Sequence, residues 1–452
     1  MRALSDAAIA DRLRAGPSSA AELMQALRVS QTSISRALRE LERQQRVLRI
    51  GSTRGARYAL RYPIAPVGSQ WPLYQIDEGG TPQELAAFTA IYRDSYHASG
   101  GPARIAGTFQ GLPYYLHDAR PSGFLGRAAP SKYPELGLPA RVNDWTDEHV
   151  LGYLTQRGSD SVGNLIVGAE ALNRYLGGLN SPPIVSVQDR ASAYPEFANA
   201  AMAGAPPGSS AHGEHPKFTA CVADGDRRTH VIVKFSPPRS TPVGLRWADL
   251  LTAEFLAHRV LQEEGIDACN SRLLDQADRV FLECDRFDRI GADGRIGAVS
   301  LHAVDITRYG LLDNWTAAAE RLTADSLLRA ADAEKIRLMD AFGALIANSD
   351  RHFGNLTLFD RYVGEFHLAP IYDMLPMLFA PQDGQIVPRH FEPAPPKAEW
   401  LGVWARARML AEEYWSRITR EPRISPDFHQ LAEQALRQIR LLPHRAAPIR
   451  VR

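Results

Sequence analysis

The chain has 452 residues, of which 45% are hydrophobic and 23% are charged. These values are typical of a folded protein with roughly two to four structural units. No run of eighteen apolar residues occurs, and the first sixteen residues lack the apolar core of a secretory signal, so neither a membrane helix nor export is expected. The three cysteines, Cys221, Cys269 and Cys284, lack metal-ligand spacing. We therefore expect a cytoplasmic protein held together by packing.

The net charge of +1 conceals a basic amino-terminal segment. Residues 1–62 contain twelve arginines against five acidic residues, a balance of +7, so the remaining residues sum to −6. This asymmetry indicates that the first module binds a polyanion. Lysine is rare, with five lysines beside 47 arginines. Because the two side chains do not substitute freely at phosphate sites, Lys217 and Lys234 are of interest as phosphate contacts.

The first sixty residues predict three helices and a β-hairpin. Apolar periodicity predicts helices at 4–14, 20–27 and 31–45, the second capped by Ser18 or Ser19 and the third by Ser30. Two strand-like pieces come next, and this order is that of a winged helix-turn-helix. Polar side chains on the third helix and the wing can donate to DNA bases and phosphates. These candidates are Gln31, Thr32, Ser33, Ser35, Arg36, Arg39, Arg54 and Arg57. The alternative is a helical domain used for dimerisation.

A proline-rich link at 62–69 separates this module from residues 70–188, whose sequence mixes short helices and strands without a catalytic constellation. The second half of the chain contains four elements that predict phosphoryl transfer. An apolar strand contains Lys234, and a helical segment twenty residues further on contains Glu254. Such a carboxylate can orient the lysine toward the phosphates of ATP. Glu263 and Glu264 are alternative partners.

The third and fourth elements are a polar loop and a later aspartate. Asp350 and Asn355 have the spacing D-x-x-x-x-N of the protein-kinase catalytic loop, in which the Asp accepts the substrate hydroxyl proton and the Asn binds magnesium. Two short strands at 356–359 and 365–369 then predict a hairpin, which returns the chain so that Asp373 faces the same metal as Asn355. Together the four elements predict a phosphotransferase.

From about residue 100 onward, these motifs make the chain similar to the HipA-like serine/threonine kinases, the toxin half of type II toxin–antitoxin pairs. The resemblance implies Asp350 as the catalytic base, Asn355 and Asp373 as magnesium ligands, and Lys234 as the clamp on the ATP phosphates. The segment 208–218 resembles the phosphate loop of the family, and 281–289 resembles its adenine-binding hinge. The further ATP-contacting residues implied are Glu254, Ser209, Ser210, Lys217, Glu283 and Arg286.

The resemblance also implies that Ser210, or the adjacent Ser209, is autophosphorylated. His215 and His352 lie within the same motifs, and we interpret them as local hydrogen-bonding residues. The HipA kinases usually rely on a separate antitoxin for DNA binding, whereas here a winged helix is fused to the kinase. The resemblance therefore supports kinase activity better than it supports toxicity.

The expected fold is α+β, with an amino-terminal winged helix-turn-helix followed by a bilobal HipA-like protein-kinase fold with a largely helical C-lobe. Expected boundaries are 1–62 for the DNA-binding domain, 63–188 for a linker and small α+β subdomain, 189–285 for the N-lobe and 286–452 for the C-lobe. The expected cofactors are ATP and Mg²⁺. Expected partners are a protein substrate and double-stranded DNA, with an antitoxin and a homodimer as further options. Two alternatives stay open, a transcription regulator with a nucleotide-sensing, inactive kinase-like domain and a small-molecule kinase.

Overall fold

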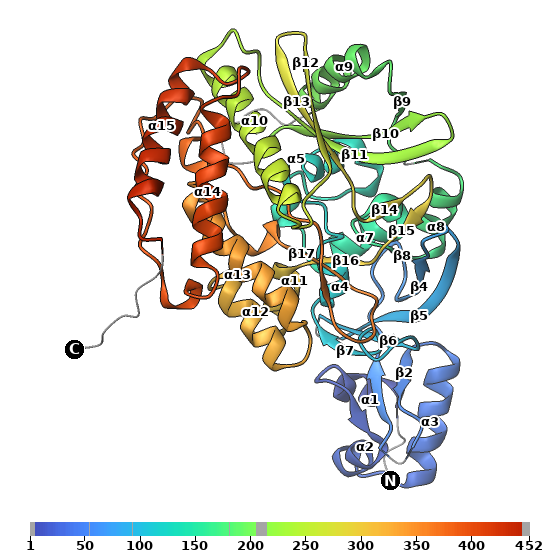
Figure 1. The fold of residues 1–452 in the computed structure, drawn as a ribbon. Coiled ribbons are helices and arrows are strands. Elements are labelled where there is room, and N and C mark those ends of the chain that lie inside the picture. Colours follow the sequence, from blue (N-terminus) through green and yellow to red (C-terminus); the bar gives the residue numbers. More distant parts are fainter. Residues whose placement is uncertain (1–4, 54, 93, 180, 205–214, 445–452) are drawn as a thin grey trace, which may run out of the picture.

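The computed structural model describes residues 5–53, 55–92, 94–179, 181–204 and 215–444. Arg54, Ser209 and Ser210, three of the predicted site residues, lie outside these ranges. In chain order, the described residues form an amino-terminal module, an antiparallel middle unit, a five-stranded sheet unit and a helical unit (Figure 1). No helix within the described ranges is both long and apolar enough to cross a bilayer.

The amino-terminal module has the predicted order of helices and strands, with boundaries within two residues of the expected ones. Its elements are α1 Asp6–Leu13, β1 Ser18–Ser19, α2 Ala20–Leu27, α3 Gln31–Arg43, β2 Val47–Ile50 and β3 Arg57–Leu60. Ser19 caps α2 in a capping box with Glu22, and Ser30 caps α3. The sequence does not predict strand β1, because two residues are too few to show the alternating pattern of a strand. It completes a three-stranded sheet with the order β1-β3-β2.

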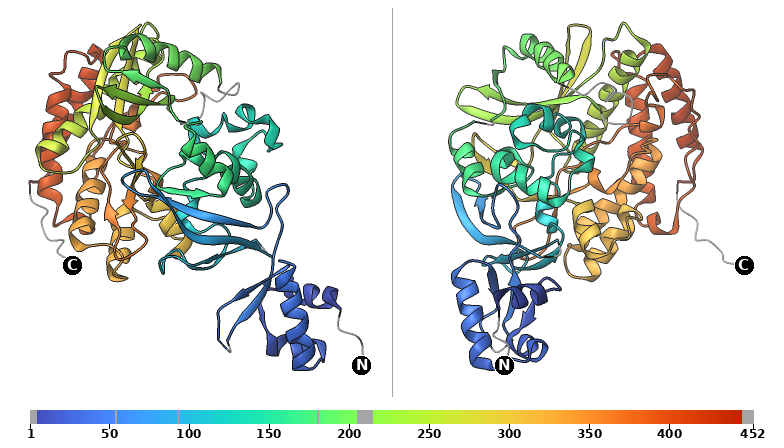
Figure 2. Two further views of the ribbon diagram at one scale, coloured as in Figure 1. Left: turned by 90° about the vertical axis from the view of Figure 1, so that its right-hand side faces the viewer. Right: turned by 180° about the vertical axis from the view of Figure 1, so that it is seen from behind.

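The middle unit is built on an antiparallel sheet with the order β7-β6-β5-β4-β8. Its strands are β4 Gln70–Ile76, β5 Pro82–Ile91, β6 Ser95–Ser99, β7 Gly107–Gln110 and β8 Leu165–Val167. Its helices are α4 Tyr114–His117, α5 Gly123–Gly126, α6 Ala129–Lys132, α7 Asp147–Arg157 and α8 Ala169–Leu176. Figures 1 and 2 show the amino-terminal module at one end of the molecule, beside this sheet. The amino-terminal module contacts this sheet just after β3, where the Tyr62 N–H donates a hydrogen bond to the Ala90 carbonyl of β5.

The next unit is a sheet with the order β12-β13-β11-β10-β9. Its strands are β9 Ile184–Ser186, β10 Lys217–Asp224, β11 Arg227–Phe235, β12 Ser271–Gln276 and β13 Arg279–Asp285, and its helices are α9 Arg190–Ala203 and α10 Pro242–Glu263. The parallel pairing of β9 with β10 begins this sheet at residue 184, slightly before the expected boundary at 189. Helix α9 covers one face, where Tyr194 packs against Phe218 and Phe281.

Helix α10 covers the other face of that sheet and joins it to the helical unit. Ala248 and Leu251 pack against Leu282 of β13, whereas Leu250 and Val260 lie in the large core of the molecule. The remaining helices are α11 Leu301–Arg308, α12 Trp315–Ala324, α13 Ala330–Leu345, α14 Trp404–Ile418 and α15 Pro426–Leu441. The remaining strands are β14 Arg289–Ile290, β15 Gly294–Arg295, β16 Ala298–Ser300, β17 Thr357–Phe359 and β18 His367–Leu368. Because α10 is buried on both sides, it fixes the sheet relative to the helices.

A buried polar cluster joins the middle unit to the turn between β17 and β18. Asp360 is fully buried and accepts hydrogen bonds from Arg104 at 2.5 Å, from the Tyr114 hydroxyl at 2.6 Å and from the Tyr362 N–H at 2.6 Å. The Arg104 guanidinium also lies 4.2 Å from the centre of the Phe366 ring. The predicted hairpin is therefore held in place by residues of the middle unit.

Replacing Asp360 by Ala should destabilise the protein, because it leaves a buried guanidinium and a buried hydroxyl without their acceptor. We expect a loss of about 3 kcal/mol in unfolding free energy, measured as a lower thermal midpoint. The neighbouring Arg361→Ala is the matched control, since Arg361 is exposed and its contact with Glu78 is long, at 3.5 Å. Equal midpoints for the two variants would contradict this role for Asp360.

Candidate active site

Lys234 of β11 lies at the centre of a buried ion cluster. Its Nζ is 2.6 Å from Oε1 and 2.8 Å from Oε2 of Glu254 on α10. The same Nζ donates to the carboxylate of Asp373, and the Asp373 N–H donates to Glu254 Oε1 at 3.2 Å. Three of the predicted residues are thus in direct contact. The alternative partner Glu263 instead pairs with Arg417 at 2.6 Å.

The two carboxylates decide the charge state of this cluster. Burial alone would lower the pKa of Lys234, but Asp373 and Glu254 more than offset burial and raise it above its usual value. Burial likewise opposes ionisation of Asp373, yet the cations Lys234 and Lys217 hold its pKa at about 2. At neutral pH the site therefore contains a charged lysine and an ionised Asp373.

Asn348 is fully buried and fixes the polar loop that follows α13 through hydrogen bonds of its side chain. Its side-chain oxygen accepts the Asp350 N–H at 3.0 Å, and its side-chain nitrogen donates to the Asp373 carbonyl at 3.2 Å. Arg351 donates to the Asn348 carbonyl and, at 3.3 Å, to Asp340 of α13. The backbone positions of Asp350 and Asp373 are therefore coupled. Asn348 was not identified as a site residue from the sequence.

Asp350 and Asn355 are close to each other at the mouth of the cluster. The Asn355 amide donates to the Asp350 carbonyl at 2.8 Å, and Asn355 ends the short helix η5 Phe353–Asn355. Partial burial raises the pKa of Asp350, which the nearby imidazole of His352 opposes. Asp373 has a left-handed backbone with φ of 54°, a strained conformation for a residue other than glycine that functional sites often contain.

A cavity of about 120 Å³ contains these side chains. It is lined by His215, Lys217, Lys234, Trp247, Leu251, Glu254, Asp350, His352, Asn355, Asp373, Leu375 and Met377. Lys217 lies opposite Lys234 in the antiparallel pairing of β10 and β11. Two cations, three carboxylates and four apolar side chains therefore line one cleft between the sheet and the helical unit. Trp247 and Met377 were not identified from the sequence, because apolar residues on a cavity wall resemble core residues.

Glu283 and Arg286 do not lie in this cavity. Lys234 is paired with Leu282 in the register of β11 and β13, so the adjacent Glu283 side chain points to the opposite face of the sheet. There it accepts from Arg190 at 2.9 Å and from Tyr194 at 2.6 Å. Arg286 is buried in an ion pair with Asp288 at 2.9 Å. Both side chains therefore stabilise the fold instead of lining the cavity that contains Lys234.

The two histidines differ in their contacts. His352 accepts the Gly354 N–H at 3.1 Å, the local role that the sequence predicted. His215 packs against Trp247 with ring centres 4.4 Å apart, and neither of its ring nitrogens has a hydrogen-bond partner within the described part of the chain. The expected hydrogen-bonding role is therefore not found for His215, and burial lowers its pKa well below the usual value.

The candidate DNA-binding residues fall into two groups. Gln31, Thr32, Arg36 and Arg39 are exposed on α3. Ser33 and Ser35 are half-buried, with the Ser33 hydroxyl 3.0 Å from that of Ser30 in the helix cap. Arg57 donates to the Pro17 carbonyl at 2.5 Å and lies 3.3 Å from Glu22, so its side chain also has a role within the module.

Comparison with known proteins identifies the class of protein to which this fold and site belong. A family model described as the HipA-like C-terminal domain matches residues 209–439. The chain therefore belongs to the HipA-like family, as its motifs predicted. A second model, the YjjJ-like toxin middle domain, matches residues 67–176. The curated Toxin YjjJ of Escherichia coli (strain K12) is 36% identical over 448 residues, covering 97% of this chain and 98% of that protein. Within the HipA-like family, the chain is thus a relative of the YjjJ toxins.

Two solved structures are more distant in sequence. The Shewanella oneidensis MR-1 toxin–antitoxin system of HipA, HipB and operator DNA contains a chain with 13% identity and a TM-score of 0.50, and the match covers 82% of this chain and 95% of that one. This likeness supports the overall fold alone. The Helicobacter pylori proinflammatory kinase CtkA matches 52% of this chain and 91% of its own, with 16% identity and a TM-score of 0.37, too low to support an inference.

Replacing Asn348 by Ala should loosen the loop that contains Asp350. Loss of its hydrogen bond to the Asp350 N–H removes about 1 kcal/mol of local protection, so amide exchange at Asp350 should become about fivefold faster. Hydrogen-exchange mass spectrometry of peptides spanning 348–355 and 371–375 measures this change. Ser349→Ala is the control, because Ser349 is exposed. Unchanged exchange in both peptides would show that Asn348 does not couple the two segments.

Proposed function

We propose that this protein is an ATP- and magnesium-dependent serine/threonine protein kinase that acts as the toxin of a toxin–antitoxin pair. The observation that carries the proposal is the contact of Lys234 with both Glu254 and Asp373, within the cavity that also contains Asp350 and Asn355. A lysine oriented by a helix carboxylate, a loop with a base and a metal-binding aspartate are the parts that phosphoryl transfer requires.

In the proposed reaction, Asp350 lies where a substrate hydroxyl enters the cavity. It orients that hydroxyl and accepts its proton while the acceptor oxygen bonds to the γ-phosphorus and the bond to ADP breaks. Lys234 and Lys217 stabilise the negative charge on the phosphate oxygens. Glu254 holds the Lys234 ammonium at 2.6 Å, so the lysine stays in the cavity where it can contact the phosphates once they replace Asp373 as its second partner.

The residues present fit a magnesium ion that is shared with the substrate. Asp373 supplies an ionised carboxylate, and Asn355 donates through its amide nitrogen to the Asp350 carbonyl, which leaves its side-chain oxygen as a candidate metal ligand. The described residues contain no group of three or more His, Cys, Asp or Glu side chains placed to hold a metal alone. Two hard oxygen ligands suit Mg²⁺, which would take its remaining ligands from phosphates and water and would neutralise charge on the phosphates.

The geometry bears on the two competing functions. A nucleotide-sensing regulator without turnover needs no catalytic base, yet Asp350 is fixed by Asn348 and stands in the same cavity as the phosphate-binding lysines. A small-molecule kinase would use the same catalytic residues. Relationship to a curated toxin favours a macromolecular target over a metabolite, and it also supports a neutralising antitoxin as a partner.

Asp350→Ala should abolish phosphoryl transfer with little change in stability, because Asp350 is half exposed and acts on the substrate. Loss of a positioned base lowers the rate by about 10²-fold or more. We would incubate the protein with magnesium and γ-labelled ATP in a lysate and locate the label by mass spectrometry. Asp226→Ala, which removes an exposed carboxylate from the turn between β10 and β11, is the control.

The position of the label separates the alternatives. Label on proteins, and on Ser210 or Ser209 of the kinase itself, would support a protein kinase that autophosphorylates. Label confined to metabolites would favour the small-molecule kinase. Wild-type turnover by Asp350→Ala would refute the assignment of the base, and no label with an initially unphosphorylated protein would favour the nucleotide-sensing regulator.

We also propose that residues 1–62 form a winged helix-turn-helix that binds double-stranded DNA. The observation that supports this function is the exposure of Arg36 and Arg39 on α3, a helix whose opposite face is fixed by Ile34, Leu38 and Leu41. A helix held in this way can enter a major groove with its outer side chains against bases and phosphates. A two-fold operator would be bound by a homodimer, and binding near its own promoter would allow autoregulation.

Arg36→Ala should weaken DNA binding and reduce its salt dependence. A single phosphate contact contributes about one to the slope of log affinity against log salt concentration, so that slope should fall by about one. Fluorescence anisotropy with a mixed-sequence duplex of about 30 base pairs measures both quantities. Arg420→Ala removes the same charge from an exposed site in the helical unit and should change neither. If wild type and both variants bind alike, α3 is not the DNA-binding helix.

A further inference from the structure

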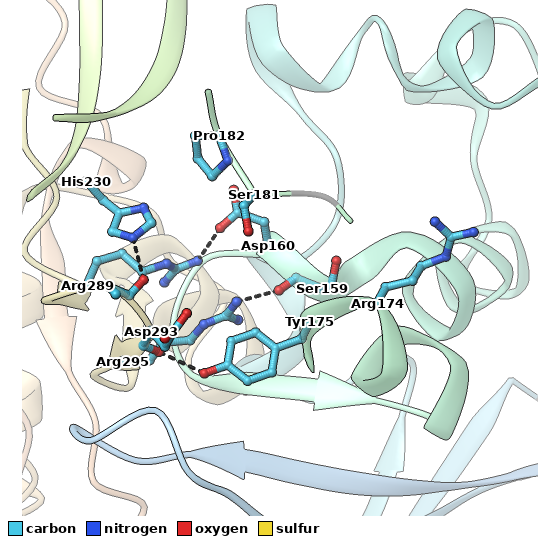
Figure 3. A pocket seen from close by; sticks show the side chains of 11 residues that line it. Ser159, Asp160, Arg174, Tyr175, Ser181, Pro182, His230, Arg289, Asp293 and Arg295 are labelled. Carbon is cyan, nitrogen blue, oxygen red and sulfur yellow. Dashed lines mark hydrogen bonds and ion pairs between the residues drawn. The ribbon is translucent and has the colours of Figure 1, made fainter. Parts of the chain in front are cut away.

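A second charged cavity lies between the middle unit and the sheet unit, away from the proposed active site (Figure 3). It has a volume of about 30 Å³. Its walls come from five segments, the short helix η3 Gly158–Asp160, α8, the segment 181–182 that precedes β9, β11, and the hairpin of β14 and β15. The lining residues are Ser159, Asp160, Arg174, Tyr175, Ser181, Pro182, His230, Arg289, Ala292, Asp293 and Arg295.

The buried charges at this cavity do not balance. Arg286, Arg289 and Arg295 are each at least nine-tenths buried. Only two carboxylates accompany them within 4 Å in the described chain, Asp160 and Asp288. Asp288 contacts both Arg286 and Arg289, and so does Asp160. Asp293 lies at the exposed rim and forms no ion pair within that distance to any described residue. Among these residues, one buried guanidinium is therefore without a counter-charge.

Arg295 is that guanidinium. It is 5% exposed, its Nη2 donates to the Ser159 carbonyl at 2.5 Å, and the group lies 4.7 Å from the centre of the Tyr175 ring. Its Nη1 is buried without a hydrogen-bond partner among the described residues. Burial, reinforced by the neighbouring Arg289, lowers the pKa of Arg295 to about 9, so the group is still charged at neutral pH. A buried charged donor without an acceptor is unfavourable unless a ligand or solvent completes it.

The size and the chemistry of the cavity restrict the groups that can complete it. Its volume is that of about two or three water molecules, so it can hold part of a tetrahedral oxyanion whose remaining oxygens project toward the exposed rim, and it excludes a nucleoside. Guanidinium groups are well suited to phosphate oxygens because their donors are planar and paired. The Ser181 hydroxyl at the rim adds a donor, and Figure 3 shows it on the side of the cavity opposite Arg295.

We propose that this cavity binds a phosphate group, either as inorganic phosphate or as the phosphate of a small monoester. The bound anion supplies the missing counter-charge to Arg295. It also bridges the two units. Ser159 and Tyr175 belong to the middle unit, whereas Arg289 and Arg295 lie on the hairpin that follows β13 of the sheet unit. Its effect is to hold the middle unit against the kinase-like part, and this binding does not depend on the proposed kinase activity.

A larger cavity adjoins the first and distinguishes the two sources of phosphate. The two share Asp160, Ser181 and Pro182, and the larger one has a volume of about 410 Å³. It extends to Thr219 and Ile232 on the face of the sheet that also carries Lys234. The organic part of a monoester can occupy this space while its phosphate lies against Arg295.

The test uses two variants at the rim that keep every contact of Arg295. Ser181→Asp places a carboxylate where the anion should bind, and Ser181→Asn is its uncharged counterpart of the same size. Ser181 is exposed, so both variants should fold, which circular dichroism checks. Isothermal titration with inorganic phosphate and with ribose 5-phosphate, against chloride at equal ionic strength, measures affinity. A second phosphate site at Lys217 and Lys234 is unchanged in both variants, so the comparison reports this cavity alone.

We expect wild type and Ser181→Asn to bind phosphate equally and Ser181→Asp to bind it at least tenfold more weakly. Tighter binding of ribose 5-phosphate than of inorganic phosphate, with the same sensitivity to Ser181→Asp, would assign the site to a monoester, and the reverse order would assign it to the free anion. The proposal is overturned if neither compound binds wild type, or if Ser181→Asp and Ser181→Asn bind both compounds with equal affinity.

Discussion

The contact of one lysine with two carboxylates constrains the rest of this molecule. Lys234, Glu254 and Asp373 come from a strand, a helix and a loop that are far apart in sequence, and each must be placed within hydrogen-bond distance of the others. Removing three charges from water is unfavourable unless they are well paired. Helix α10 meets this requirement because it is buried on both sides, so Glu254 cannot move without disturbing the sheet or the helical core. The cost of desolvation thus explains why the cluster lies at the junction of the two units.

The same contact determines which charged groups Lys234 and Asp373 are paired with before any ligand binds. While Lys234 pairs with Asp373, the carboxylate that should bind magnesium already has a partner. If a metal and a triphosphate bind, Asp373 would pair with the metal and Lys234 with the phosphates, so both groups would keep a partner of opposite charge. Glu254 holds Lys234 from helix α10 and not from the loop that contains Asp373. The helix carboxylate would therefore retain the lysine in the cleft during that exchange.

The sequence predicted those parts of the site whose residues lie a few positions apart in a recognisable pattern. The interval from Asp350 to Asn355 and the hairpin before Asp373 are contiguous patterns, and the serines at 18–19 and 30 mark the starts of α2 and α3 by their position alone. Glu283 shows the limit of such patterns. The motif in which it occurs resembles a nucleotide-binding hinge as a whole, although strand periodicity places every second side chain on the opposite face of the sheet. Asn348 was missed for another reason, because an asparagine in a polar loop becomes distinctive only when both of its hydrogen-bond partners are known.

The arginines of this chain acquire different roles from their surroundings, which the composition alone could not separate. Arg36 and Arg39 stand exposed on a helix whose other face is apolar, so their charge is available to a large polyanion. Arg295 has the same side chain but lies against the Tyr175 ring in a cavity of about 30 Å³, which is too small for a polyanion. The residues around Arg295 are spread along the sequence from Ser159 to Arg295 and form no motif. The sequence of residues 70–188 alone therefore does not reveal this cavity. Among the described residues, the exposed arginines of α3 and the buried Arg295 thus differ in their surroundings, and burial limits the size of any anion that could reach Arg295.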